Sequence, residues 1–392
     1  MSQNHSVVIT GIGLVSSLGE GVEKHWELLN SPSTAPNIDV NSFAPYTVHA
    51  LCEVDWSKQI PKRSDQRQME TWQRLGTYAA GLALEDAGVK GNLDVTSTMD
   101  MIVAAGGGER DINVDVDILG KGRTSSNREI MLNETLSTEL RPTLFLAQLS
   151  NLLAGNISIV HKVTGSSRSF MGEEGSGLAA LMIAVARIRS GQSTHALVGG
   201  SYNAQHYDML LGQELGGLLK RDGWAPVWQR ENCQGGGLVT GSGGVFLVLE
   251  SKERAKQRGA NIYAEISDLV TDQTNREKVP LSQTLETMFK RIKGQSGFIV
   301  SGASGAKGVT EVEKDLWEKS MLPYRGISTL FGHWREAQFP LAVALAALTV
   351  KKNHGFNALS ETEKAFEGKI ESVVVSTVGT TRAEGMARLI AG

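Results

Sequence analysis

The chain has 392 residues, of which 41% are hydrophobic and 21% charged, a composition typical of an ordered globular protein with a large core. Its formal net charge is −3, which excludes an overall basic field that would attract nucleic acid or a membrane surface. Two cysteines without metal-ligand spacing, no signal-type segment and no run of about 18 apolar residues predict a cytoplasmic protein without a metal site.

Short apolar strands alternate with helices along the chain. The first strand, Val7–Thr10, leads into a glycine-rich turn, Gly11–Gly19, that imitates a dinucleotide-binding loop. Because the third glycine and the later acidic residue are missing, we expect no cofactor there. Further helices are predicted over 22–29, 68–87, 142–154, 251–258, 282–292, 311–319 and 339–351, further strands over 101–105, 196–200, 244–250, 262–269, 297–302 and 370–377, and polar surface segments over 31–66 and 109–140.

This alternation predicts the fold class. Strands as apolar as these are covered on both faces, so the pattern indicates an α/β protein built in layers. The same order of strands and helices returns after residues 251–260. We therefore expect two halves of similar plan, an N-terminal half over 1–252 with surface insertions and a C-terminal half over 253–392.

The most informative stretch is 163–189, where a glycine- and serine-rich strand gives way to a helix that is apolar on nearly every side. Such a helix suits burial at the centre of a large protein, which would place its N-terminus inside. Unpaired N–H groups and the positive end of the helix dipole collect there, so this elbow can activate a cysteine or hold an anion. Two glutamates, Glu173 and Glu174, occupy the elbow instead.

Four stretches, in chain order, resemble the β-ketoacyl-acyl-carrier-protein synthases of type I/II. They are VVITGIGLVSSLGEGVEKHWELL, ALVGGS, GLVTGSGGVFLVLESKERAKQRGANIYAEI and the FGH at 331–333. The resemblance implies a thiolase fold, with two duplicated halves in a five-layered αβαβα arrangement, and a homodimer or a heterodimer. It also implies an acyltransferase of fatty acid biosynthesis that uses acyl carrier protein, whose 4′-phosphopantetheine carries the acyl groups, and no cofactor of its own.

The resemblance also locates a catalytic set, most of which is replaced. The acyl-carrying cysteine corresponds to Glu174, the first histidine to Gly302 and the supporting lysine to Ser328, while the second histidine is kept as His333. The gate loop over 377–382 is altered as well. A thiolate is required to form the acyl thioester, so the sequence does not establish that this chain can carry out the condensation step.

A basic group, Lys62, Arg63 and Arg67, lies where the family's surface for the acidic carrier protein is expected, although a solvated loop explains it equally well. Glu174 has three interpretations: a structural residue that caps the helix or pairs with Arg168 or Arg187, a ligand-holding residue, or a product of misalignment. His333 is either an electrophilic helper or a structural residue.

Four functions remain open at this stage. The first is a condensation-deficient, chain-length-factor-like subunit that pairs with a cysteine-bearing ketosynthase, and the second is an active 3-oxoacyl-acyl-carrier-protein synthase with atypical catalytic groups. The third is a malonyl-carrier-protein decarboxylase that uses His333, and the fourth is a module that binds carrier protein without chemistry.

Overall fold

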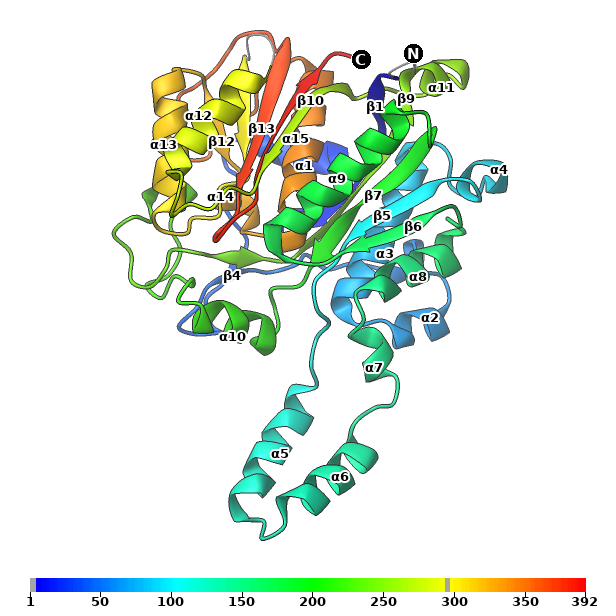
Figure 1. The fold of residues 1–392 in the computed structure, drawn as a ribbon, viewed down its shortest axis with the longest axis vertical. Coiled ribbons are helices and arrows are strands. Elements are labelled where there is room, and N and C mark those ends of the chain that lie inside the picture. Colours follow the sequence, from blue (N-terminus) through cyan, green and yellow to red (C-terminus); the bar gives the residue numbers. More distant parts are fainter. Residues whose placement is uncertain (1–4, 293–296) are drawn as a thin grey trace.

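The structure is a computed structural model that describes residues 5–292 and 297–392 (Figure 1). The first four residues of the expected N-terminal half, and residues 293–296 of the C-terminal half, lie outside the described residues. None of the described helices is long and apolar enough to cross a membrane.

Eleven strands of the described chain form one mixed sheet, to which each half contributes five in the main path. The two sets join where β1 pairs antiparallel with β10, Val8 opposite Glu265. The path runs through β12 (Tyr324–Gly326), β11 (Phe298–Ser301), β13 (Ser372–Val378), β14 (Glu384–Ile390), β10 (Ala264–Asp272), β1 (Val7–Ser16), β9 (Gly243–Ser251), β7 (His195–Tyr202), β5 (Asp100–Ala104) and β6 (Ser167–Phe170), with β2 (Gly19–Glu20) beside β1. A small second sheet contains β3 (Ile38–Asp39), β4 (Val48–His49) and β8 (Thr240–Gly241).

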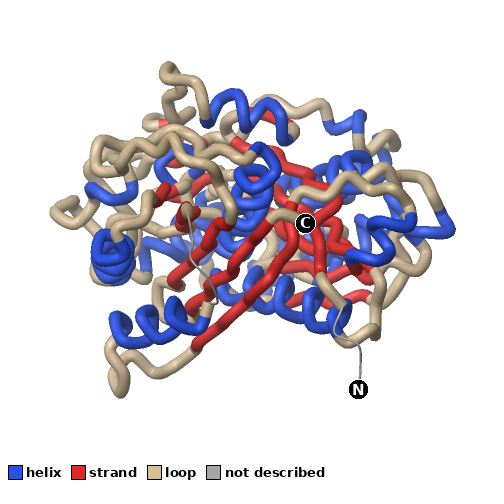
Figure 2. The backbone as a smooth tube through the Cα atoms, turned by 90° about the horizontal axis from the view of Figure 1, so that it is seen from above, coloured by secondary structure: helices blue, strands red, loops and turns tan. Residues whose placement is uncertain are grey.

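Helices cover this curved sheet in layers (Figure 2). α9 (Glu173–Arg189) and α15 (Gln338–Lys352) pack against each other between the two sets of strands, in the largest apolar cluster of the described chain. α3 (Thr71–Asp86) and α8 (Asn151–His161) cover the outer face of the N-terminal set, and α12 (Leu281–Arg291) and α13 (Val309–Ser320) cover that of the C-terminal set. The five-layered αβαβα prediction is confirmed, whereas the boundary at 252/253 stays a prediction.

The remaining described helices are short or peripheral. They are α1 (Val22–Leu29), α2 (Arg63–Gln68), α4 (Leu93–Thr96), α5 (Ile112–Thr124), α6 (Arg128–Glu139), α7 (Leu144–Ala147), α10 (Tyr207–Leu215), α11 (Lys252–Gln257) and α14 (Ser328–Phe331), with 3-10 turns at Trp56–Lys58, Val227–Gln229 and Arg335–Ala337.

The structure corrects the prediction of a turn after Thr10. β1 continues to Ser16 through Gly11 and Gly13, because α3 crosses the strand there at very short range. A Cβ atom at Gly13 would lie 1.9 Å from the carbonyl oxygen of Ala79. These glycines permit close packing of helix on strand and do not form a turn.

Three other segments also differ from the predictions. Residues 109–140 contain α5 and α6, which form a helical hairpin that projects from the body (Figure 1). The helix expected over 142–154 is divided into α7 and α8, and α8 continues beyond the predicted end to His161. β14 follows the strand expected to be last, and was missed because Glu384 and Arg388 interrupt its apolar pattern.

Candidate functional site

The elbow lies where β6 ends and α9 begins. Gly172 precedes the helix with φ of 114°, in the region that favours glycine, and Glu173 and Glu174 form the first turn. The apolar faces of α9 are buried against β5, β7 and α15. The prediction that the helix N-terminus lies inside holds only in part, because Gly172 and Glu173 are exposed and burial begins at Glu174. Glu174 is only 3% exposed.

Glu174 contacts the gate loop and His333. Its Oε1 accepts a hydrogen bond of 3.3 Å from the backbone N–H of Thr380, and lies 3.5 Å from Nε2 of His333. Its Oε2 is buried without a hydrogen-bond partner among the described residues. Burial raises the pKa of the Glu174 carboxyl to about 7, because the cost of removing the anion from water exceeds its stabilisation by backbone N–H groups.

His333 is equally buried, at 1% exposure. Its backbone is held between Val239 and Gly241 by hydrogen bonds of 2.9 and 3.1 Å, while neither ring nitrogen has a hydrogen-bond partner among the described residues. Burial first, and the charges of Arg335 and Arg230 second, lower the pKa of His333 to about 3. Below about pH 7 both groups are therefore uncharged, and above it only the carboxyl is charged, so we do not regard the 3.5 Å contact as an ion pair.

Gln338 connects the positions of the replaced first histidine and lysine. Its Nε2 donates to the carbonyl oxygen of Gly302 at 3.1 Å and to Oγ of Ser328 at 3.0 Å, and its Oε1 accepts from the backbone N–H of Trp334 at 2.8 Å. Ser328 in turn donates to the carbonyl of Ala303 at 2.6 Å. One buried amide therefore joins three segments that the resemblance assigns to catalysis.

Gln338 also fills the space beside Gly302. A Cβ atom at Gly302 would lie 2.6 Å from Cγ2 of Thr377 and 3.2 Å from Cγ of Gln338. A histidine cannot be accommodated at this position without displacing one of these neighbours. The sequence analysis missed Gln338. A signal was available, because Gln338 is followed by ten apolar residues in the stretch QFPLAVALAAL.

The pairing expected between Glu174 and Arg187 is wrong. Arg187 binds Asp100 at the far end of α9, with 2.8 Å between Nε and Oδ2, and Arg168 is exposed on β6. The guanidinium near the elbow is that of Arg335, 3.7 Å from Oε1 of Glu173. Arg335 adopts a positive φ of 43° and was also missed from sequence.

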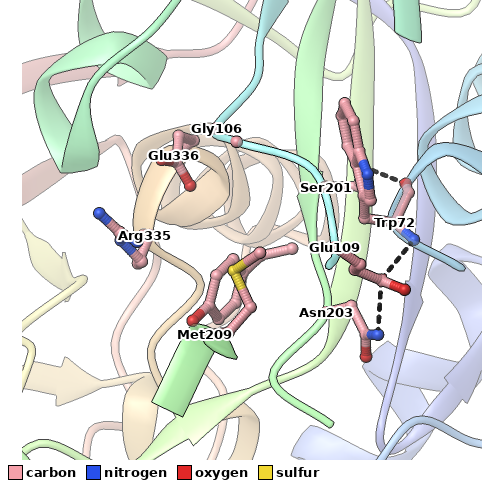
Figure 3. Close-up of a pocket in the computed structure, with 10 residues that line it drawn as sticks. Trp72, Gly106, Glu109, Ser201, Asn203, Met209, Arg335 and Glu336 are labelled. Atoms are coloured by element: carbon pink, nitrogen blue, oxygen red, sulfur yellow. Dashed lines mark hydrogen bonds between the residues drawn. The ribbon is translucent and has the colours of Figure 1, made fainter. Parts of the chain in front are cut away.

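Arg335 and Glu336 form one side of a small polar cavity at the ends of β5 and β7 (Figure 3). Trp72, Glu109 and Asn203 face them from the other side, joined by hydrogen bonds from the Trp72 backbone N–H and Asn203 Nδ2 to Glu109 Oε1. The cavity volume is about 20 Å³. That is room for one water molecule and not for an acyl chain.

A larger hollow of about 730 Å³ opens outside the elbow, with Gly172, Glu173, Ser176 and the gate-loop residues Thr381 and Arg382 in its wall. The basic residues Lys62, Arg63 and Arg67 lie elsewhere, exposed on α2 and the residue before it. The structure therefore brings Glu174, His333, Gly302 and Ser328 into one buried region and keeps the basic group on the surface.

Comparison with known proteins identifies the family. A profile of the beta-ketoacyl synthase N-terminal domain matches residues 4–255. The chain belongs to the beta-ketoacyl synthase family. Among curated relatives, the 3-oxoacyl-[acyl-carrier-protein] synthase 2 of Vibrio cholerae is 27% identical over 269 residues, 66% of this chain and 61% of the relative. That of Rhizobium meliloti is 28% identical over 278 residues, 66% of this chain and 62% of the relative. The matched region thus spans less than two thirds of each ketosynthase.

Solved structures share the whole fold at low identity. The ishigamide ketosynthase/chain length factor has a TM-score of 0.77 and 20% identity, and covers 99% of this chain and 100% of its own. A beta-ketoacyl synthase from Burkholderia phymatum has the same TM-score and coverage at 18% identity. A type II polyketide ketosynthase, in complex with its acyl-carrier protein, has a TM-score of 0.73 and 16% identity, again over 99% and 100%. This ketosynthase-like chain is a divergent member that lacks the nucleophilic cysteine.

Proposed function

We propose that the protein is a condensation-deficient, chain-length-factor-like subunit of acyl-chain synthesis that pairs with a cysteine-bearing ketosynthase. The observation that carries the proposal is Glu174, which occupies the buried elbow, contacts the gate loop and cannot form an acyl thioester. An active synthase with atypical groups would need another nucleophile at this elbow.

Two further features of the described residues support the loss of condensation. The place of the first histidine is closed by Gln338 and Thr377. Cys52 is a poor substitute nucleophile, because burial and the nearby Glu20 raise the pKa of its thiol.

A test of the function combines two measurements. The purified chain is incubated with acyl-carrier protein loaded with an acyl group, and its intact mass is recorded; we expect no added acyl mass. Co-expression with a cysteine-bearing ketosynthase of the same genome is expected to give a stable complex whose products differ in length from those of that ketosynthase alone. An acyl adduct on this chain, or products unchanged by its presence, would refute the proposal.

We infer that the carrier protein meets the basic group on α2. Lys62, Arg63 and Arg67 are exposed together, and acidic partners are attracted by such local charge. The double variant Arg63→Glu/Arg67→Glu is expected to weaken carrier binding by about tenfold or more at low salt. Lys290→Glu/Arg291→Glu, a double reversal of exposed charges on α12, is the matched control. Equal binding by both variants would refute this surface.

One observation favours a second function, decarboxylation of malonyl-carrier protein. His333 is neutral and its ring nitrogens are unpaired among the described residues, so Nε2–H can donate to an enolate oxygen in the tautomer that places the proton there. Release of carbon dioxide that is abolished by His333→Ala and retained by Lys290→Glu would support this function. Absence of release from the unmodified chain would exclude it.

A further inference from the structure

Arg230 is a buried cation with an unused hydrogen-bond donor. It follows the 3-10 turn Val227–Gln229 and is 1% exposed. Its Nε donates a hydrogen bond of 2.9 Å to the carbonyl oxygen of Ala225, and its Nη1 a longer one of 3.4 Å to that of Gly237. Its Nη2 has no hydrogen-bond partner among the described residues. Burial lowers the pKa of the guanidinium to about 9, so the group is still a cation at neutral pH.

A second buried arginine shows what Arg230 lacks. Arg325 donates to three backbone carbonyl groups at 2.9–3.0 Å, and a carboxylate oxygen of Glu363 lies 4.0 Å from its Nε. Among the described residues, no carboxylate pairs with Arg230 in this way. A buried charge without a partner is costly, so Arg230 is suited to bind an anionic group that comes from solution.

Two glycines make the room for this guanidinium. Gly237 and Gly305 have φ of 92° and 86°, in the region that favours glycine. A Cβ atom at Gly305 would lie 2.6 Å from Nη1 and 2.9 Å from Cδ of Arg230. Two loops that are distant in the sequence are therefore both shaped around the charged group.

Arg230 lines a cavity of about 180 Å³ between the segment 227–231 and α13. This volume is room for about six water molecules, at about 30 Å³ each. Thr310, in the first turn of α13, lines the same cavity, and the positive end of a helix dipole favours an anion there. Val227 and Trp228 are the apolar residues of the lining, against which a short hydrocarbon chain can pack.

The cavity also contains an unused acceptor of opposite charge. Oε2 of Glu311 is buried and has no hydrogen-bond partner among the described residues. Glu311 and Arg230 both line the cavity, but neither Oε2 nor Nη2 is bonded to the other. One unpaired donor and one unpaired acceptor in a single cavity point to a molecule that carries both a negative and a positive group.

The charges of the whole lining decide the class of this molecule. The lining carries four carboxylates and two cations, which are Glu231, Glu311, Asp315 and Glu318 with Arg230 and Lys314. This excess of negative charge repels a dianion such as inorganic phosphate and attracts an ammonium group. Arg230 in turn requires an anion beside it. A molecule with one carboxylate and one ammonium group satisfies both conditions.

We propose that this cavity binds a small aliphatic amino acid, whose carboxylate contacts Arg230 and the first turn of α13 and whose ammonium group contacts Glu311. The inference goes beyond the proposed function and does not depend on it, because binding is measured on the purified chain without any ketosynthase or carrier protein.

The test is titration calorimetry of the purified full-length chain at about pH 7 and fixed ionic strength. The probes are 4-aminobutyrate, butyrate and butylammonium, which share one carbon skeleton and differ only in their charged groups. We expect 4-aminobutyrate to bind with a Kd below about 5 mM. Butyrate and butylammonium each lack one of the two charged contacts and are expected to bind at least about tenfold more weakly.

Two variants assign the two ends of the ligand. Arg230→Met is expected to weaken 4-aminobutyrate binding by at least about tenfold, because it removes the partner of the carboxylate. Glu311→Gln is expected to weaken it by about fivefold and to strengthen butyrate binding, because one negative charge is removed from the cavity. Glu367→Gln, at an exposed carboxylate outside the lining, is the matched control and should leave both Kd values unchanged.

Folding of the variants is checked by circular dichroism and melting temperature. Should the buried Arg230→Met variant fail to fold, Glu311→Gln decides the question, because opposite effects on two ligands cannot arise from loss of structure.

Several results would overturn the inference. A Kd above about 5 mM for 4-aminobutyrate would show that the cavity holds water only. Binding of butyrate or butylammonium as tightly as 4-aminobutyrate, or effects of Glu311→Gln that have the same sign for both acids, would also refute it. Tighter binding of inorganic phosphate than of 4-aminobutyrate would assign a simple anion site instead. Each of these results would leave the proposed function intact.

Discussion

The substitution Glu174→Gln should make the protein more stable at alkaline pH and leave it unchanged at acid pH. The carboxyl has an ordinary pKa of 4.5, which burial raises to about 7 in the folded chain. A change of this size corresponds to about 3 kcal/mol between the two protonation states. The folded state therefore binds the proton more tightly than the unfolded state between about pH 4.5 and 7.

The sign follows from this difference. As the pH rises from 4.5 to 7 the unfolded chain loses its proton first, so the unmodified protein loses stability over that window and regains none above it. Glutamine is uncharged at every pH, and its side-chain oxygen can still accept the hydrogen bond from Thr380. The stability gained by Glu174→Gln should thus grow by about 2.5 kcal/mol between pH 5 and pH 8.5, since the first part of the loss is complete at pH 5.

The assay is urea unfolding, followed by tryptophan fluorescence, of both proteins at a series of pH values. His333 is present in both proteins, so its own contribution largely cancels in the comparison. A difference that is constant with pH, or that shrinks as the pH rises, would refute the conclusion that Glu174 is a buried neutral acid. It would indicate that the helix N-terminus holds the anion instead.

Three further predictions concern stability measured by the same urea assay. The unmodified protein should lose about 2 kcal/mol of stability between pH 6.5 and 5, because the unfolded His333 imidazole takes up a proton there and the folded one does not. His333→Asn should abolish this loss, and an unchanged dependence of the unfolding free energy on pH would contradict the prediction. Gln338→Leu should cost about 2–4 kcal/mol, since it leaves the buried N–H of Trp334 and two acceptors without partners, and a cost below about 0.5 kcal/mol would show that the network is dispensable. Gly13→Ala should cost about 3 kcal/mol because its Cβ meets a carbonyl of α3, whereas Gly107→Ala, with open space around it, should be nearly neutral; equal costs would contradict the close crossing.

The sequence was sufficient for the parts of the fold that depend on local pattern. The apolar faces of α9 and α15 and the runs in β5, β7 and β9 repeat with the period of their element, and each lies where it was expected. β1 differs because glycine has two uses. Locally, Gly11 and Gly13 favour a turn, but only the position of α3 reveals that they permit close packing.

Residues of the candidate site that lie in or beside a sequence motif could be proposed from the sequence. Residues whose place in the site depends only on tertiary contacts were missed. Flanking residues located Glu174, and the FGH motif located His333. Gln338 and Arg335 have no such motif, because their roles come from segments that are distant in sequence, such as Gly302 and Ser328. Residues 109–140 were expected to be a polar surface segment and no helices were predicted there, because the mixed composition hides the helical period of α5 and α6.

The amide of Gln338 sets the order in which the family's catalytic residues could be introduced into this chain. A histidine at residue 302 meets the side chains of Gln338 and Thr377 as soon as its Cβ is added, so that reversal is disfavoured while Gln338 remains. Shortening Gln338 first leaves the Trp334 N–H unpaired before any catalytic benefit exists. A cysteine at residue 174 has no such barrier but gains little alone. Packing therefore opposes a stepwise return of the family's residues, and positions 302, 338 and 377 would have to change together.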